Sequence, residues 1–383
     1  MNYNFDIELL TQLRYQLHQN AELSNQELNT AKIIKAFISQ AEPDTIAENI
    51  GGHGLVFEFK GSDPEGLKIG FRADIDALPI DESIDLPYGS NKKGVAHKCG
   101  HDGHSAIVAA LASLVSNNKF KNTIYLIFQP AEEIGTGAKA VIQHFTKNAL
   151  KLDYIIGLHN LPGFETGEVI ARIGTFTPAS TGMIITLKGK NSHAAEPENG
   201  ISPATAFSNI IQNLQIIIEK LDSDELALCT VIQASLGEIA FGTSPAYAEI
   251  RATLRANNDK DLAKLVAIAE EMVKQEATTE MLELTISYTE SFPSTINSEN
   301  AFNLIRRAAK NESTTMDEKP EPFKWSEDFG HYKKYTESVF FGLGAGINCP
   351  NLHNEKYDFP DEIILTGAKI YAGIINLLED AKT

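Results

Sequence analysis

The chain has 383 residues, more than a single hydrophobic core usually organises, so its length predicts two domains. Its net charge of −18 and its lack of Lys/Arg clusters exclude a nucleic-acid partner, because binding to phosphates requires such clusters. We expect no export signal, because no N-terminal stretch combines a basic start with an apolar run, and the apolar runs fall short of the ~20 residues that a membrane span needs. Three cysteines cannot form a disulfide framework in so long a chain. We therefore expect a cytoplasmic protein with no membrane partner.

Up to about residue 175, helical patterns alternate with short apolar strands. The expected elements, in chain order, are a helix at 28–40, a strand at 68–75, a buried helix at 105–115 and strands at 124–129 and 154–158. Strands that are apolar on both faces and separated by helices are typical of a largely parallel sheet with helices on both sides. This part of the chain therefore predicts an α/β domain.

The pattern changes in the middle of the chain, where strands alternate strictly between apolar and polar residues. The order strand, helix, strand, strand, helix, strand is expected at 183–188, 204–220, 229–236, 247–254, 261–273 and 282–288. This order is that of the ferredoxin-like α+β unit. A strand at 338–343 and a helix at 361–378 then return to the first pattern. We predict an α/β domain of residues 1–175 and 291–383, with the α+β domain, 176–290, inserted into it.

The first chemical feature is the run His97-Lys-Cys99-Gly-His101-Asp-Gly-His104, which lies before the expected helix at 105–115. Thiolate and imidazole are good ligands for zinc and related metals. Each residue alone has a structural interpretation, since a histidine on a loop is usually solvated and a cysteine beside glycine is usually just small and buried. The density of such residues favours a metal site.

The second feature is a set of polar residues that follow the expected strands, where α/β proteins bind ligands. Glu132 and Glu133 come directly after the strand at 124–129. One carboxylate could coordinate a metal while the other moves protons. The alternative is an acidic helix N-terminus, which the helix dipole favours. The other residues that follow strands are Asp74, Asp76, His159 and His353.

These residues belong to runs that span nearly the whole chain. The runs are Leu17-His18…Ala21-Glu22-Leu23, Phe71-Arg-Ala-Asp74-Ile-Asp76-Ala-Leu-Pro79, Cys99-Gly-His101-Asp-Gly-His104, Gln129-Pro-Ala-Glu132-Glu133, Gly157-Leu-His159-Asn, Ser192-His193-Ala-Ala, Ser326-Glu327-Asp328-Phe329 and Leu352-His353-Asn. In them the chain resembles the M20 metallopeptidases, and especially the branch of N-acyl-amino-acid, hippurate and auxin-conjugate amidohydrolases.

This resemblance implies a fold similar to zinc exopeptidases and a site for two divalent metal ions, zinc or manganese, with nickel or cobalt also suited to the ligands. It implies that Cys99 is shared by both metals, where the wider family uses an aspartate. The remaining ligands would be Glu133 and His353 for one metal, and His101 and His159 for the other.

The resemblance also implies the roles of the residues around the metals. Glu132 would be the general base that takes a proton from the attacking water and returns it to the leaving nitrogen. Asp74 or Asp76 would orient the ligands by hydrogen bonds. The implied reaction is hydrolysis of the amide bond of an N-acyl amino acid or short peptide.

The inserted domain would be the lid and dimerisation domain, giving a homodimer or a dimer-based oligomer. Its His193 would stabilise the oxyanion, and Arg255 would face a substrate carboxylate, although a solvated arginine at a strand end is the equal alternative. The chain departs from the branch at Gly242-Thr-Ser-Pro245, which lacks an asparagine that positions substrate in relatives. Ser202 also stands where an aspartate is usual.

Three other functions remain open from the sequence alone. A dipeptidase or aminopeptidase of the same family is the nearest. A cysteine hydrolase with Cys99 as nucleophile would leave Glu132 and Glu133 unexplained. A silent metal- or peptide-binding protein would not need Glu132. The residues for which we expect only packing or surface roles are His18, His53, His144, His331, Cys229 and Cys349.

Overall fold

The computed structural model describes residues 3–380, which fold as two compact units. The first unit contains the described residues up to 176, then 295–321 and those from 328 onward. The second unit contains Thr177–Ser294 and Pro322–Glu327. The chain therefore leaves the first unit at residue 177 to build most of the second, returns at 295, and contributes a further short segment to the second unit at 322–327.

The first unit is built on an eight-stranded sheet whose four central strands are parallel. Because they are parallel, their carboxyl ends meet at one edge of the sheet. From one side of the sheet to the other the strands are β1 (Thr45–Ile50), β2 (Gly54–Phe59), β4 (Thr123–Gln129), β3 (Lys68–Asp74), β5 (Tyr154–Leu161), β16 (Glu337–Gly344), β6 (Val169–Ala171) and β15 (Met316–Glu318). A separate pair consists of β7 (Gly174–Thr177) and β14 (Thr295–Asn297).

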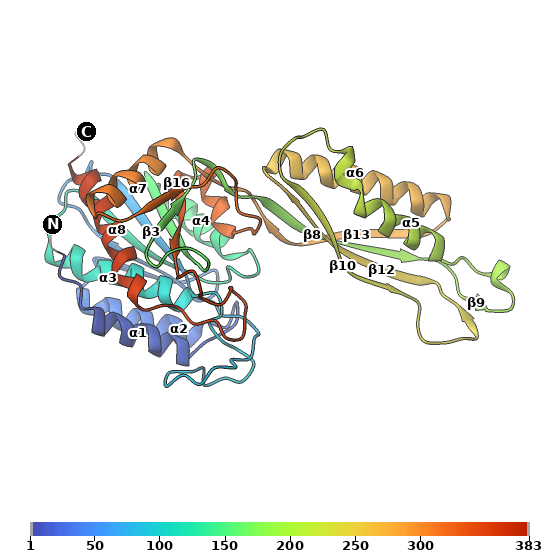
Figure 1. Cartoon of the computed structure of the whole chain (residues 1–383), viewed down its shortest axis with the longest axis horizontal. Helices are drawn as coiled ribbons and strands as arrows, with labels where there is room; N and C mark the ends of the chain where they lie inside the picture. Colours follow the sequence, from blue (N-terminus) through green and yellow to red (C-terminus); the bar gives the residue numbers. More distant parts are fainter. Residues whose placement is uncertain (1–2, 381–383) are drawn as a thin grey trace. The chain divides into compact units, whose positions relative to one another are not determined.

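Helices bury both faces of this sheet, as the apolar strands predict. Phe71 of β3 and Phe341 of β16 contribute to the core under the larger group of helices (Figure 1), which are α1 (Ile7–Gln19), α2 (Leu28–Ile38), α3 (His101–Asn117), α7 (Glu299–Asn311) and α8 (Glu362–Glu379). The neighbouring Phe340 packs on Phe329 of the 3-10 segment Asp328–Lys334, with 4.8 Å between ring centroids, and α4 (Gly137–Lys147) packs beside that segment. None of the described helices is long and apolar enough to cross a membrane.

The second unit has its own sheet and core (Figure 1). Four antiparallel strands lie in the order β10 (Ala227–Leu236), β12 (Tyr247–Ala256), β8 (Ala179–Lys188) and β13 (Glu283–Phe292). The predicted alternation in β12 is present, since Ile250 and Leu254 are buried against α5 (Ala204–Gln215) and α6 (Asp259–Thr279) while Arg251 is exposed. A short ribbon joins β9 (Ser192–His193) to β11 (Thr243–Ser244).

Two predicted boundaries near the chemical residues are wrong. The helix expected from about Ser105 begins at His101, because Gly100 adopts a φ of +96° that allows a sharp entry, and Asp102 places a negative charge in the first turn. The strand expected to end at residue 158 continues to Leu161, because β16 pairs with it along that whole length. His159 therefore lies inside β5 and not beyond its end.

Candidate metal centre

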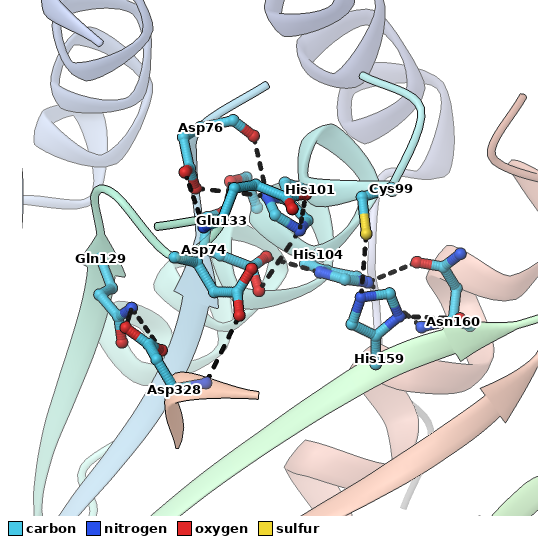
Figure 2. Close-up of polar contacts among 12 residues, drawn as sticks. Asp74, Asp76, Cys99, His101, His104, Gln129, Glu133, His159, Asn160 and Asp328 are labelled. Carbon is cyan, nitrogen blue, oxygen red and sulfur yellow. Dashed lines mark hydrogen bonds and ion pairs between the residues drawn. The ribbon is translucent and has the colours of Figure 1, made fainter. Parts of the chain in front are cut away.

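Five candidate ligands gather at the carboxyl edge of the central strands. Figure 2 labels Cys99, His101, Glu133 and His159. His159 is part of β5, while Cys99 and His101 flank Gly100 at the start of α3. Glu133 lies in the turn after β4. His353 lies in the loop after β16, where it adopts a left-handed φ of +64°. Residues far apart in the sequence are thus brought to one place by parallel strands.

Two groups of these side chains share the cysteine, and His101 Nε2 of one lies 3.7 Å from Glu133 Oε1 of the other. Cys99 Sγ lies 3.4 Å from His159 Nε2 and 3.4 Å from His353 Nε2. One group consists of Cys99, His101 and His159, and the other of Cys99, Glu133 and His353, with the ligand atoms of each group within 4.8 Å of one another. Each group has the mixture of sulfur, nitrogen and oxygen donors that zinc and its neighbours accept.

The hydrogen bonds of the cluster fit a divalent cation. His101 Nδ1 lies 2.8 Å from the main-chain oxygen of Asp76, and His159 Nδ1 lies 2.9 Å from that of Asn160, so both Nε2 atoms face the cluster. His101 Nε2 and Glu133 Oε1 are buried 3.7 Å apart, and neither forms a hydrogen bond with any described residue. A buried polar atom that lacks a hydrogen bond costs about 1–3 kcal/mol, a cost that a cation bound between the two atoms removes.

The electrostatics of the cluster also favour a cation. Burial lowers the pKa of His159 well below its usual range, so the ring is neutral, which is the form that binds metals. Burial raises the pKa of Glu133 to about 7. Burial would lower the pKa of His101, but the Asp74 and Asp76 carboxylates outweigh this effect and raise it to about 10. The Asp74 and Asp76 carboxylates therefore favour a positive charge at the cluster.

Asp76 contacts two of the candidate ligands at once. Besides its main-chain contact with His101, its Oδ2 accepts hydrogen bonds from the main-chain nitrogen of Glu133 at 3.0 Å and from the Ser24 hydroxyl at 2.7 Å. These bonds orient one ring and one peptide of the cluster. Ser24 could not be singled out from its local sequence, because its partner lies 52 residues away.

Asp74 anchors a second set of hydrogen bonds below the ligands (Figure 2). Its Oδ1 lies 2.6 Å from His104 Nδ1, and its Oδ2 accepts a hydrogen bond from the Arg72 guanidinium at 2.6 Å. His104 Nε2 lies 2.5 Å from Asn160 Oδ1. His104 is therefore engaged on both sides by neighbours of the ligands. His97 is also buried, and neither of its ring nitrogens forms a hydrogen bond within the described residues.

Glu132 lies in the turn after β4. This turn is not a helix N-terminus, since α4 begins only at Gly137, so that alternative interpretation of the acidic pair is wrong. The main-chain nitrogen of Asp328 donates to Glu132 Oε1 at 3.4 Å. The carboxylate of Asp328 accepts hydrogen bonds from Gln129 at the end of β4 and from the Arg72 guanidinium. The turn is thus tied to two of the central strands.

The structure places His193 and Arg255 in the second unit, so neither is part of the cluster within the first. His193 is exposed in β9, and its Nδ1 accepts a hydrogen bond from the main-chain nitrogen of Ala195 at 3.0 Å. β9 pairs with β11, inside the segment 242–245 where the sequence departs from its relatives. Arg255 in β12 donates to the Ser326 hydroxyl at 2.7 Å.

Comparison with known proteins decides the family. The model of peptidase family M20/M25/M40 matches residues 70–377. The chain belongs to this family. Its resemblance to M20 enzymes is therefore confirmed, as is the prediction that it is a hydrolase.

Over most of its length, this M20/M25/M40 chain is also similar to proteins whose descriptions name a particular activity or metal content. It is 31% identical over 363 residues to hippurate hydrolase of Campylobacter jejuni, covering 94% of each chain. It is 32% identical over 340 residues to N-acetyl-L-cysteine deacetylase of Bacillus subtilis, covering 87% of this chain and 79% of the relative. Among solved structures, it resembles the YXEP protein of Bacillus subtilis, described as a dinuclear metal-binding peptidase from the M20 family, with 26% identity, a TM-score of 0.83 and coverage of 98% and 99%.

The structure also reveals a buried polar network beside the cluster that the sequence did not indicate. His18, for which we expected only packing, lies 2.9 Å from Asp102 and 2.9 Å from Glu82. Arg14 donates to Asp102 at 3.1 Å, and Lys98 binds Glu82 at 2.5 Å. Lys98 and Asp102 belong to the run that carries Cys99 and His101, and the other members of the network hold them from outside it. Nothing in the local sequence marks the network, since its members come from separate segments.

The prediction that Cys229 and Cys349 are buried is wrong, since both are half-buried. Cys229 and Cys349 were expected to be buried like small hydrophobic residues, but only Cys99 is buried. Cys229 lies in β10, at the edge of its sheet, where no further strand covers it.

The His18 network predicts a pH-dependent contribution to stability. Burial would lower the pKa of His18, but hydrogen bonds to the Asp102 and Glu82 carboxylates raise it to about 9, above the ordinary histidine value of 6.5. A histidine with a raised pKa stabilises the fold fully below pH 6.5, and this stabilisation disappears as the pH rises through 9. The free energy of unfolding lost in His18→Gln should therefore be roughly 3 kcal/mol smaller at pH 10 than at pH 6.

The measurement is denaturant unfolding of the wild type and His18→Gln at both pH values. His53→Gln is the control, because His53 is half-exposed and lies outside the network. Equal losses for His18→Gln at pH 6 and pH 10 would contradict a charged His18.

Proposed function

We propose that this protein is a metal-dependent amidohydrolase that cleaves the amide bond of N-acyl amino acids, with Glu132 as general base. The observation that carries the proposal is the pair of ligand groups that share Cys99 within reach of Glu132. The relatives described as hippurate hydrolase and N-acetyl-L-cysteine deacetylase support the same substrate class.

The proposed centre holds two divalent ions. His101 and His159 would complete one set of ligands, and Glu133 and His353 the other, with Cys99 shared. A thiolate among imidazoles suits zinc, and manganese, nickel and cobalt are the other candidates. Bound divalent ions lower the pKa of a coordinated water and polarise a carbonyl oxygen, which is the chemistry they would supply here.

The chain supplies the proton transfer. Glu132 lies within 4.8 Å of His101 and Glu133, so its carboxylate is close enough to accept a proton from a water attacking the amide carbon. The same carboxyl then delivers the proton to the leaving nitrogen. The main-chain nitrogen of Asp328 holds one carboxylate oxygen, and Asp74 and Asp76 orient the surrounding rings and peptides.

The second unit, close to the predicted residues 176–290, is proposed as the lid and dimerisation domain. His193 would stabilise the oxyanion, and Arg255 would bind the substrate carboxylate. In support of dimerisation, β10 is an edge strand with Ile232 62% exposed, and an unpaired edge can be extended by a second copy of the chain.

A cysteine hydrolase is the competing mechanism. Both atoms that lie 3.4 Å from the Cys99 sulfur are imidazole nitrogens, an arrangement that a nucleophile and its base would also show. That mechanism leaves the buried Glu133 Oε1 and His101 Nε2 without a purpose. Metal dependence separates the two mechanisms.

The deciding experiment removes metal with phenanthroline and restores zinc, manganese, cobalt or nickel singly. Each form is assayed on N-acetyl and N-benzoyl amino acids and on dipeptides. We expect no turnover by the metal-free protein, recovery with at least one metal, and preference for the N-acyl amino acids. Preference for dipeptides would make the protein a peptidase of the same family. Full activity without metal would contradict the proposal, and so would failure of every metal and substrate.

A further inference from the structure

The turn that carries Glu132 has an unusual backbone. Ala131, directly before Glu132, is buried and has a φ of +51°, in the left-handed region that residues with a side chain rarely adopt. Such a conformation costs roughly 1–2 kcal/mol and persists only where the surroundings hold it. Its main-chain oxygen accepts hydrogen bonds from Thr136 and Gly137 at 3.2 Å, which closes the turn on the side of α4. The amide nitrogens of the turn need separate partners.

Two carboxylates bind the amide nitrogens on either side of Glu132. Glu27 Oε1 accepts a hydrogen bond from the main-chain nitrogen of Ala131 at 2.9 Å. Asp76 Oδ2 accepts one from the main-chain nitrogen of Glu133 at 3.0 Å. The peptide before Ala131 and the peptide that leaves Glu132 are therefore both fixed by buried acceptors. The peptide between them is held through its oxygen by Thr136 and Gly137, so the direction of the Glu132 side chain follows from the three contacts.

The two carboxylates are joined by one short segment. Ser24, which donates to Asp76 at 2.7 Å, and Glu27 are three residues apart, and Glu27 Oε1 also accepts from the main-chain nitrogen of Asn25 at 2.9 Å. The segment itself is attached to the end of β3, because the main-chain nitrogen of Ala77 donates to the oxygen of Glu22 at 2.8 Å. The clamp on the turn is thus anchored to the central sheet.

Glu27 has no evident structural task that would explain its burial. It occupies the N-cap position of α2, yet its side chain does not cap that helix. Glu22 performs that task, since its carboxylate accepts hydrogen bonds from the main-chain nitrogens of Asn29 and Thr30 at 2.8 and 3.0 Å. Glu27 is fully buried, its Oε2 has no hydrogen-bond partner within the described residues, and burial raises its pKa to about 7. Keeping a carboxylate there is costly.

We propose that Glu27 is a positioning residue for catalysis, which holds the left-handed turn at Ala131 and thereby aims the carboxylate of Glu132. This inference rests on the proposed role of Glu132 as general base. Glu27 touches neither substrate nor metal ligands. Its loss leaves the ligand set complete but lets the turn relax toward ordinary backbone angles, which moves the base away from its working position.

The test compares Glu27→Ala and Glu27→Gln with the wild type and with Glu22→Ala. Glu22→Ala is the matched control, because it removes a half-buried carboxylate from the same segment. It loosens α2 but leaves the contacts of the turn in place. Glu27→Ala should lower kcat by about 10- to 100-fold, since small misplacements of a catalytic group have effects of that size, while KM and metal content change little. Glu27→Gln keeps an oxygen acceptor and should recover most of the loss.

A second measurement does not depend on turnover. Hydrogen exchange of the Ala131 amide should accelerate in Glu27→Ala and remain slow in Glu22→Ala, because only the first loses the acceptor. The proposal is overturned if Ala131 exchanges at the wild-type rate in Glu27→Ala, or if Glu22→Ala loses as much kcat as Glu27→Ala. If Glu27→Ala does not fold, Glu27→Asp takes its place, because its shorter side chain withdraws the acceptor from the Ala131 amide. A lower kcat and faster exchange of that amide in Glu27→Asp support the proposal, and wild-type values of both overturn it. A wild type that cleaves no substrate contradicts the proposed function instead, and the exchange result still decides the role of Glu27 in the turn.

Discussion

Replacing Glu132 with glutamine is expected to lower kcat by about 10²- to 10⁴-fold, the range that general acid–base catalysis contributes. Glutamine has nearly the same shape and can still accept the hydrogen bond from the main-chain nitrogen of Asp328, so the turn should keep its structure. What it cannot do is accept and return a proton. Metal content should stay at the wild-type level and KM should change little. Steady-state kinetics with metal analysis of the same samples gives the measurement.

Glu133→Gln is the matched control for this prediction. The two carboxylates are adjacent, and both lie within 4.8 Å of His101, so proximity alone does not say which binds metal. Only Glu133 also belongs to the group with Cys99 and His353, and its substitution should therefore lower metal content as well as kcat. Loss of metal in Glu132→Gln would make that residue a ligand, and an unchanged kcat would exclude it as the base.

The central strands were predictable because each is a run of apolar residues bounded by polar ones. The strands expected at 68–75, 124–129 and 154–158 correspond to β3, β4 and β5, and their parallel pairing brings their ends to one edge. Because of that, residues after separate strands could be expected to meet. The same reasoning failed for His159, since pairing with β16 and not apolarity determines where β5 ends.

The supporting hydrogen bonds were not predictable from local sequence. Arg14 and Asp358 are separated by 344 residues, and Arg72 and Asp328 by 256, so each pair exists only through the tertiary fold. The residues that neighbour an arginine in the sequence do not show whether its side chain is buried or solvated. The short strands β6 and β15 were also missed, because three residues are too few to show a period. Both strands form because they pair with neighbouring strands of the sheet.

Cys99→Ala is expected to remove the metal centre, because this thiolate is the member common to both ligand groups. Changes to residues that merely orient ligands lower metal affinity by about 10- to 100-fold, so loss of a shared ligand should exceed about 100-fold and leave almost no activity at ordinary metal concentrations. Competition with a chromogenic chelator measures the affinity directly. Cys349→Ala is the control, since Cys349 precedes His353 in the same loop but belongs to neither group.

Cys99→Asp tests the chemistry of the shared position separately from its presence. A carboxylate can bridge two ions as a thiolate can, but it is a harder donor, so the order of affinities should shift from zinc toward manganese. Metal content with manganese should then approach the wild-type level, and activity should return in part with that metal. If Cys99→Asp and Cys99→Ala bind every metal equally poorly, the site requires sulfur. If Cys99→Ala binds zinc as tightly as the wild type, Cys99 is not a ligand, and a nucleophilic role for its thiol becomes the better explanation of its two imidazole neighbours.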